Sequence, residues 1–378
     1  MNASNTVLLS RKGALLPTYP PSRVAFVEGD GVWLVDADGR RYLDFAAGIA
    51  VVALGHRHPA PLTAAHAQLD RLWHASNLFG TEPAVELARK LSERFGGAQA
   101  FFCNSGAEAN EAALKYARKA TGKPGVIALD GGFHGRTLGA LGVTGQPVKR
   151  GNFVDAGATF VRPNDIDGLR AAMSDEIGLI LLEPVLGEGG VIPLTAEFAA
   201  AARELDALLC FDEVQTGVGR TGSFFAWEQI GVKPDLVTLA KGLANGLPIG
   251  ALLVSDDATG AFVPGDHGST FGGNPVSCAA ACAVLDTTDE ELLAAVLSNG
   301  AGLLAGLSQL PGVVEARGAG LLVGAELDRP AQEVVDAALD AGLVVLTSGA
   351  NVLRLAPPLV VEPKHIDQAL TILEEVLR

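Results

Sequence analysis

The sequence is poor in cysteine, and its few cysteines are not arranged as metal ligands. The four cysteines of the 378 residues form no CxxC motif; they are Cys103, Cys210, Cys278 and Cys282. The last two are spaced by about one helical turn in an alanine-rich segment, which favours buried thiols over a metal site. His56 and His58 in "GHRHP" have no third ligand nearby and are weak evidence for metal. We therefore predict no metal site.

Positive charge is scarce as well. The formal net charge is −15, and no block of lysines and arginines interrupts the acidic background. This balance argues against nucleic acid or an anionic membrane as a partner and is typical of a soluble protein. An anionic ligand would then need a local site built from individual arginines and backbone amides.

Long apolar runs are absent although 48% of the residues are hydrophobic. No run reaches the roughly 18 residues that a membrane helix needs. The first residues, "MNASNTVLLSRKGALLP", do not have the pattern of a signal peptide. We expect a soluble, cytoplasmic protein with a large core, divided into one big domain and a smaller one.

Short, continuous apolar runs are what the sequence does contain. They are separated by helix-like or turn-rich segments and read "GVIALD", "ATFV", "GLILLEP", "LLCFDEV" and "DLVTLA". Continuous runs, unlike alternating ones, are typical of parallel strands buried on both faces. The sequence therefore predicts an α/β fold with a mostly parallel sheet.

The flanking segments predict helices and two domains. Helices are expected over 83–95 and 107–120, the second with one small-residue face made of Ala109, Ala112, Ala113, Tyr116, Ala117 and Ala120. Residues 29–45 predict two strands around the Asp38–Gly39 turn. From about Pro275 a long helix, several strands and a final helix follow. We predict a large domain over 51–274 and a small α+β domain over 275–378, which the N-terminal segment 1–50 joins.

Charged residues end three of the predicted core strands. Glu183, Asp212 and Lys241 follow one another at intervals of 29 residues, about one βαβ unit each. In such sheets ligands bind beyond the carboxyl ends of the strands. A desolvated lysine can attack carbonyl groups, and pyridoxal phosphate is an electron sink for that chemistry if a carboxylate such as Asp212 keeps its ring nitrogen protonated. A purely structural Lys241–Asp212 ion pair is the alternative.

Two further motifs could bind the ends of such a cofactor and its substrate. In "FFCNSGAEANEAALK", Ser105 and Glu108 form an S-x-x-E capping box, and Gly106 lets an anion approach the helix N-terminus. In "GGFHGRT", Phe133 could stack on a flat ring and Arg136 could bind a carboxylate. The alternatives are an ordinary capped helix and a turn with a solvated arginine.

The stretch "GVGRTG", residues 217–222, matches the dinucleotide fingerprint by pattern only. Residues 212–215 separate its glycines from the preceding strand, and "SFFAWEQIG" is a poor start for the helix that should follow. An NAD-dependent dehydrogenase therefore remains a distant alternative.

Over nearly its whole length the chain resembles the class III, fold-type I aminotransferases, which use pyridoxal phosphate. The resemblance lies in the motifs above and in "DADGRRYLDFAAGIAVVALGHRHP", "SNLFGTEP", "LLEPVLGEGGV", "LAKGLANGLPIGA", "HGSTFGGNPVSCAA" and "NVLRLAPPLVV". It implies a large domain with a mostly parallel sheet of the seven-stranded type, a smaller α+β domain, and a homodimer with shared active sites.

The resemblance also implies roles for individual residues. Lys241 would bind the cofactor as a Schiff base and carry the proton, with Asp212 at the ring nitrogen. The ring would lie between Val214 and Phe133. The remaining expected contacts are Ser105, Gly106 and Ala107 at the phosphate, Thr270 at the phosphate of the neighbouring subunit, Glu213 and Gln215 elsewhere on the cofactor, Ser269 and Arg136 at the substrate, and Arg354 with its partner acid Glu188.

Within the family the chain is most similar to the members that act on N2-acetylornithine. The expected reaction transfers the terminal amino group of that compound to 2-oxoglutarate, giving N-acetylglutamate 5-semialdehyde and glutamate. Relatives acting on ornithine, succinylornithine, 4-aminobutyrate or carrier-bound lysine precursors share most of these motifs and stay open as alternatives. A catalytically silent pyridoxal-phosphate regulator is another.

Overall fold

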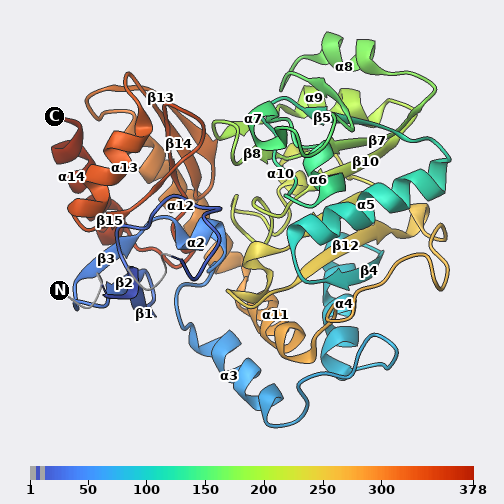
Figure 1. The fold of residues 1–378 in the computed structure, drawn as a ribbon, viewed down its shortest axis with the longest axis horizontal. Coiled ribbons are helices and arrows are strands. Elements are labelled where there is room, and N and C mark those ends of the chain that lie inside the picture. Colours follow the sequence, from blue (N-terminus) through green and yellow to red (C-terminus); the bar gives the residue numbers. More distant parts are fainter. Residues whose placement is uncertain (1–5, 9–12) are drawn as a thin grey trace.

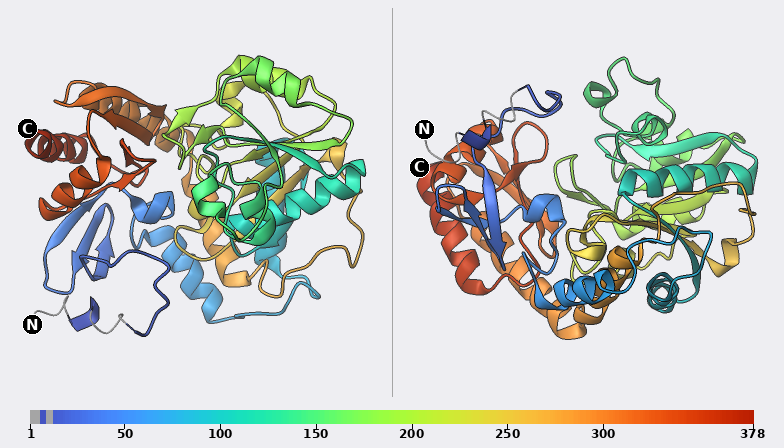
Figure 2. Two further views of the ribbon diagram at one scale, coloured as in Figure 1. Left: turned by 45° about the horizontal axis from the view of Figure 1, so that its top comes forward. Right: turned by 60° about the horizontal axis from the view of Figure 1, so that its bottom comes forward.

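The protein consists of a large and a small domain that lie side by side (Figure 1). The computed structural model describes residues 6–8 and 13–378. In the views of Figure 2 the blue N-terminal strands lie against the red C-terminal elements, so the two parts of the chain build the small domain together.

A seven-stranded sheet forms the centre of the large domain, as predicted. Its order is β4-β12-β11-β10-β7-β5-β6, and only β12 runs antiparallel to its neighbours. The strands are β4 (Ala98–Cys103), β5 (Gly125–Leu129), β6 (Thr159–Val161), β7 (Ile177–Leu182), β10 (Leu208–Asp212), β11 (Leu236–Leu239) and β12 (Gly250–Ser255).

Helices cover both faces of this sheet, which explains the continuous apolar runs. Val237 and Leu253 pack on one face with α4 (Glu82–Phe95) and α11 (Pro275–Thr287). Leu236 and Leu252 pack on the other face with α5 (Gly106–Thr121). The predicted helices 83–95 and 107–120 are thus confirmed.

The shorter elements of the large domain are α3 (Pro59–Leu69), α6 (Leu138–Gly142), α7 (Pro147–Arg150), α8 (Ile166–Ala172), β8 (Val185–Leu186), β9 (Ile192–Pro193), α9 (Ala196–Arg203), α10 (Trp227–Ile230), η1 (Lys241–Ala244) and η2 (Asp256–Ala258).

The small domain is α+β, as predicted. Its antiparallel sheet has the order β13-β14-β17-β16, made of β13 (Val313–Ala319), β14 (Leu322–Leu327), β17 (Val352–Leu355) and β16 (Leu346–Thr347). Its helices are α12 (Glu290–Leu307), α13 (Ala331–Asp340) and α14 (Pro363–Leu377). The N-terminal strands β1 (Phe26–Asp30), β2 (Trp33–Asp36) and β3 (Arg41–Asp44), followed by α2 (Ala47–Ala50), join it because β3 pairs in parallel with β15 (Leu343–Val344).

Two local predictions need correction. Residues 29–45 take part in three strands instead of two, because Gly31 has a positive φ of 54° and separates β1 from β2; the turn at Asp38–Gly39 is present as predicted. Ala120 is exposed although the other five members of its predicted face are buried, since it lies in the last turn of α5 beside Arg118 and Lys119.

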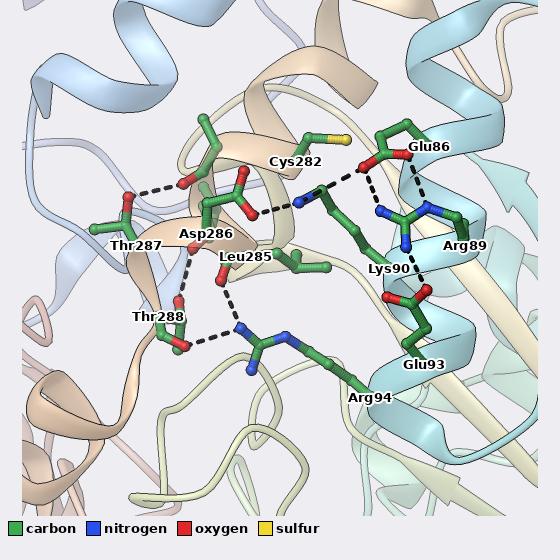
Figure 3. Close-up of polar contacts among 12 residues, drawn as sticks. Glu86, Arg89, Lys90, Glu93, Arg94, Cys282, Leu285, Asp286, Thr287 and Thr288 are labelled. Atoms are coloured by element: carbon green, nitrogen blue, oxygen red, sulfur yellow. Dashed lines mark hydrogen bonds and ion pairs between the residues drawn. The ribbon is translucent and has the colours of Figure 1, made fainter.

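Helix α11 packs on the large domain although the predicted boundary places it in the small one. It contacts α3 and α4, and side chains from α4 bind its C-terminal turn (Figure 3). Lys90 pairs with Asp286, and Arg94 donates to the carbonyl oxygens of Leu285 and Thr288 at 2.6 and 3.0 Å. The division at residue 274 remains a prediction, and these contacts lead us to propose placing it after α11.

Helix α12 is the one helix in the described part of the chain that is long and apolar enough to cross a membrane by length and composition alone. Its 18 residues have a mean hydropathy of 1.2. It packs on α14, β13 and β14, and Leu303 and Leu307 are fully buried in the small-domain core. The buried part of the helix, 28% of its residues, thus belongs to the small-domain core.

Candidate active site

The three charged strand ends meet at one cavity. Strands β7, β10 and β11 are neighbours, and their carboxyl ends bring Glu183, Asp212 and Lys241 to the same edge of the sheet. All three line a cavity of about 420 Å³. The expected crevice at the carboxyl ends of the strands is thus present, with the expected groups in it.

Lys241 opens the 3₁₀ helix η1 just beyond β11, with a left-handed φ of 35°. A non-glycine residue in that region stores backbone strain, which is often found at functional sites. Burial, and then the nearby charge of Arg354, lower the pKa of Lys241 to about 8, while Glu188, Asp212 and Glu183 act in the opposite direction. A substantial fraction of the amine is therefore neutral and nucleophilic near pH 8.

Asp212 is buried and held by hydrogen bonds to both carboxylate oxygens. Oδ1 accepts from the backbone N–H of Val214 at 3.0 Å. Oδ2 accepts from Asn110 Nδ2 at 2.7 Å and lies 2.7 Å from Nδ1 of His134. Burial alone would lower the pKa of His134, but the hydrogen bond to Asp212 and the charges of Asp212 and Glu183 together outweigh burial and raise the pKa. The carboxylate therefore has a fixed orientation toward the cavity.

The residues around Asp212 are the ones that sequence reasoning missed. Asn110, His134 and Thr238 form a buried chain in which Thr238 Oγ1 donates to Asn110 Oδ1 at 2.8 Å, and Asn110 Nδ2 also donates to the carbonyl of His134 at 2.8 Å. Asn110 was detectable as the polar residue among the alanines on the buried face of α5. Nothing in the sequence pairs His134 with Asp212, because 78 residues separate them.

Glu183 joins two loops that flank the cavity. Its carboxylate accepts from the backbone N–H of Phe133 at 2.7 Å and of Gly187 at 3.1 Å. Burial, with the nearby charge of Asp212, raises its pKa to about 7. Glu183 thus fixes the backbone of both loops beside the cavity.

The start of α5 offers an anion site. Ser105 Oγ accepts from the N–H of Glu108 at 3.2 Å, which is one half of the predicted capping box. The other half differs, because Glu108 accepts from the N–H of Asn104 and not from that of Ser105. Ser105, Gly106 and Ala107 line the cavity, where free amides and the helix dipole favour a phosphate. A Cβ on Gly106 would lie only 2.7 Å from both Val214 methyl groups, so only glycine fits.

The expected ring-binding residues also line the cavity: Phe133, Val214 and Gln215. Arg136 lines it too and lies exposed, with its Cζ 5.7 Å from the centre of the Phe133 ring. Buried Arg354, on β17, forms the expected ion pair with Glu188 and donates to the carbonyl of Gly187 at 2.7 Å. It also lies 3.4 Å from Gln215 Oε1, which connects the small domain to the cavity.

Four expected site residues lie outside the lining of this cavity: Arg354, described above, and Glu213, Ser269 and Thr270. The Glu213 carboxylate accepts from the N–H groups of Ala226 and Trp227 at 2.7 and 2.9 Å, and burial raises its pKa to about 8. Ser269 accepts from Asn104 Nδ2 at 3.0 Å, behind the phosphate-binding turn. Thr270 is exposed on the surface.

The "GVGRTG" loop packs the two domains together. A Cβ on Gly222 would lie 2.3 Å from a methyl group of Leu297, and one on Gly219 would lie 3.0 Å from Thr288. The fully buried Arg220 donates to the carbonyl oxygens of Leu321 and Pro357 of the small domain. These glycines therefore permit close packing, which explains the fingerprint without a dinucleotide.

The two histidines of "GHRHP" have structural partners. His56 Nε2 lies 2.7 Å from the buried carboxylate of Asp44, and His58 Nδ1 accepts from the N–H of Ala60 at the start of α3.

The cavity fits pyridoxal phosphate. A helix N-terminus, a buried carboxylate, a facing aromatic ring and a lysine of lowered pKa surround one space of suitable size. Gly135 packs closely against the first turn of α5, where an added Cβ would lie 2.6 Å from that of Ala107. The phosphate would lie at Ser105–Ala107 and the ring between Phe133 and Val214.

Comparisons with known proteins find a matching family and relatives that cover nearly the full chain. The family described as aminotransferase class-III matches residues 17–377. An acetylornithine aminotransferase of Corynebacterium efficiens is 47% identical over 98% of this chain and 96% of its own, and one of Streptomyces coelicolor is 49% identical over 94% and 92%. Among solved structures, the ornithine aminotransferase of Toxoplasma gondii superposes with a TM-score of 0.94 at 30% identity, covering 100% and 95% of the two chains. The N-acetylornithine aminotransferase of Stenotrophomonas maltophilia gives a TM-score of 0.84 at 35% identity, covering 95% and 96%.

Proposed function

Because the chain belongs to the class III aminotransferases, which depend on pyridoxal phosphate, we propose that it transfers the terminal amino group of N2-acetylornithine to 2-oxoglutarate. The products are N-acetylglutamate 5-semialdehyde and glutamate, and the reaction is a step of arginine biosynthesis, which we place in the cytoplasm. The observation that carries the choice of donor is the 47% identity, over nearly the full chain, to relatives named for this substrate.

Pyridoxal phosphate, when bound, supplies the carbonyl group that takes up the amine and a ring that withdraws electrons. Lys241 holds the cofactor through Nζ, and its pKa of about 8 lets the same atom accept and return a proton near neutral pH. The fixed carboxylate of Asp212 stabilises a protonated ring nitrogen. Phe133 and Val214 would hold the ring between them.

Three charged residues of the chain can distinguish the two substrates. Arg136 binds the carboxylate of N2-acetylornithine and the distal carboxylate of glutamate, because the two distances from the reacting carbon differ by about one bond. Arg354 binds the carboxylate attached to the reacting carbon, which only glutamate carries. Glu188 pairs with Arg354 while the donor is bound, which avoids a buried unpaired cation. A fixed ion pair without movement is the alternative.

A panel of amino donors tests the proposed substrate. N2-acetylornithine should exceed ornithine in kcat/KM by about tenfold or more, because the free α-ammonium of ornithine must be desolvated near Arg136, a cost of the order of 1–3 kcal/mol. Succinylornithine, 4-aminobutyrate and a wild-type assay without donor complete the panel. Equal kcat/KM for ornithine and N2-acetylornithine would assign the enzyme to the ornithine branch instead.

We propose further that the active unit is a homodimer in which Thr270 contacts the phosphate bound by the partner. Exposed apolar side chains lie in the neighbouring segments: Phe271 follows Thr270, and Trp73, Leu78 and Phe79 lie in the segment whose Asn77 Nδ2 donates to the carbonyl of Ser269. Their exposure is unusual for a free surface and fits a subunit interface.

Mixing two defective variants tests this arrangement. Lys241→Ala and Thr270→Ala subunits should form hybrid dimers in which one site has both residues, so mixing should restore activity and phosphate affinity at that site. No restoration, with hybrids demonstrated by mass, would mean that Thr270 does not act across the interface.

A further inference from the structure

Glu188 lies between two cations. Its Oε1 is paired with Arg354, and its Oε2 lies 3.4 Å from Nζ of Lys149. The Arg354 side chain is only 4% exposed, whereas Lys149 is 25% exposed. The carboxylate therefore connects a cation deep in the site to one at its outer side.

Lys149 is held at this position by its surroundings. It belongs to the short helix α7, and its Nζ lies 4.6 Å from the centre of the Phe133 ring. The next residue, Arg150, anchors the helix by donating to the carbonyl of Thr144 at 2.5 Å. A cation over the ring face and beside a carboxylate has two favourable contacts at once.

The backbone on both sides of Glu188 is fixed. The N–H of Gly187 is bonded to Glu183, and the carbonyl of Gly187 accepts from Ser348 Oγ at 2.9 Å. The N–H of Gly190 donates to the same Ser348 Oγ at 2.7 Å. Glu188 can therefore leave Arg354 only by rotating its side chain, and a short rotation keeps it within reach of Lys149.

Glu188 needs a neighbouring cation both when it pairs with Arg354 and when it has moved away from Arg354. Burial favours its neutral form, but the charges of Arg354, Lys149 and Lys241 outweigh burial and lower its pKa. When 2-oxoglutarate occupies Arg354, an ionised and partly buried Glu188 without a partner would oppose binding.

We propose that Lys149 is the second partner of Glu188: it holds the carboxylate in the open position and so releases Arg354 to the dicarboxylate substrate. This inference rests on the proposed function and adds a positioning residue to it, because Lys149 acts through Glu188 and not on the reacting atoms. Arg354, Glu188 and Lys149 then form one switch, in which the carboxylate of Glu188 is paired with a cation in both positions.

Equilibrium binding to the holoenzyme tests this role without turnover. Glutarate has two carboxylates and requires Arg354 to be free, whereas N2-acetylnorvaline is the donor without its reacting amine and leaves Glu188 on Arg354. In Lys149→Met, calorimetry should show glutarate binding about tenfold weaker and N2-acetylnorvaline binding within about twofold of wild type. Lys149→Arg should restore glutarate affinity.

Two controls separate the switch from a general effect of charge. Lys364→Met removes the same charge from exposed α14 and should leave both affinities unchanged. In a Glu188→Gln background, Lys149→Met should no longer weaken glutarate binding. Equal weakening of both ligands, or a loss of glutarate affinity that persists in the Glu188→Gln background, would overturn the proposal.

The outcome is independent of the choice of donor. If N2-acetylornithine is not turned over by wild type but glutamate is, the proposed donor is wrong while the glutarate measurement still decides the role of Lys149. If glutarate binds Lys149→Met as tightly as wild type, the role of Lys149 is wrong whatever the donor.

Discussion

At the residue scale, two effects of the fold lower the pKa of the Lys241 amine toward neutral pH. Its desolvated position acts first, and the neighbouring guanidinium of Arg354 adds to it, bringing the pKa to about 8 from an ordinary 10.5. The cation that we propose for a substrate carboxylate thus also lowers the pKa of the nucleophile.

The pH dependence of cofactor capture follows from this pKa. The apoenzyme should take up pyridoxal phosphate at a rate that rises with pH and levels off above about pH 8, because only the neutral amine attacks. Arg354→Gln removes a like charge, so the pKa should rise and capture at pH 7 should slow. Stopped-flow absorbance measures both profiles; an unchanged midpoint in the variant would contradict the electrostatic cause.

Asp212 gives a second prediction at this scale. Asp212→Ala should lower kcat far more than it weakens cofactor binding, because the proposed phosphate site at Ser105–Ala107 is untouched. Steady-state kinetics at saturating cofactor, with a separate cofactor titration, distinguish the two effects. A variant that keeps more than about a tenth of kcat, a loss of only ~1.4 kcal/mol, would show that the carboxylate has another role.

The sequence predicts these two residues because both follow apolar runs that end at the same edge of a sheet. It does not predict the residues that orient them. His134 and Thr238 reach Asp212 and Asn110 through contacts between different elements, and no spacing along the chain encodes those contacts.

At the scale of elements, the first turn of α5 has two roles. Its N-cap stabilises the start of the helix, and its backbone amides face the cavity. Ser105 and Asp289 cap α5 and α12 in the same way, each accepting from an N–H three residues on. Only the first of these caps lies at the cavity.

This pair allows a matched test. Ser105→Ala and Asp289→Ala should each lower the free energy of unfolding by about 1 kcal/mol, the usual cost of a lost cap. Only Ser105→Ala should also weaken pyridoxal-phosphate binding, measured by titrating the apoenzyme. Equal cofactor affinity in the two variants would show that this cap is structural only.

Helix positions were predictable because caps and apolar periodicity are local. The turn between β1 and β2 was overlooked although its signal is local: Asp30 pairs with Trp33 around Gly31, whose φ is positive. The half-formed capping box was not predictable, because the choice of Asn104 over Ser105 as the donor to Glu108 depends on the geometry at the end of β4.

At the scale of the whole molecule, the site depends on how closely the domains approach. Gly320 of the small domain lies against the "GVGRTG" loop, where a Cβ would meet backbone atoms of Thr221 at 2.5–2.7 Å. The N–H of Leu321 donates to the carbonyl of Arg220 at 3.0 Å in the same contact. Arg354 reaches Glu188 from this small domain, so a shift of the domains would move it.

Gly320→Ala should therefore impair both stability and the use of 2-oxoglutarate. Gly231→Ala is its control, because Gly231 has a similar positive φ of 77° but nothing within 4 Å of its added Cβ. The control should lose about 1–2 kcal/mol of stability from the left-handed backbone alone. Gly320→Ala should lose more and should raise KM for 2-oxoglutarate; a KM equal to that of the control would mean that domain spacing does not set the position of Arg354.

The two-domain division and the sheet were predictable from the order of apolar runs and helices. The Arg354–Glu188 ion pair was expected from the family resemblance, since 166 residues separate its members and no local pattern connects them. From the residues alone we could predict the site at the carboxyl edge of the sheet. The side chains that the small domain adds to this site could not be predicted in that way.

The central claim is that Lys241 carries the cofactor. Reducing the holoenzyme with borohydride, digesting it and sequencing the modified peptide by mass spectrometry tests this most directly. We predict a stoichiometric pyridoxyl-phosphate adduct on Lys241 and none in Lys241→Ala. An adduct on another lysine, such as Lys149 beside the same ring, with Lys241 unmodified would contradict the account.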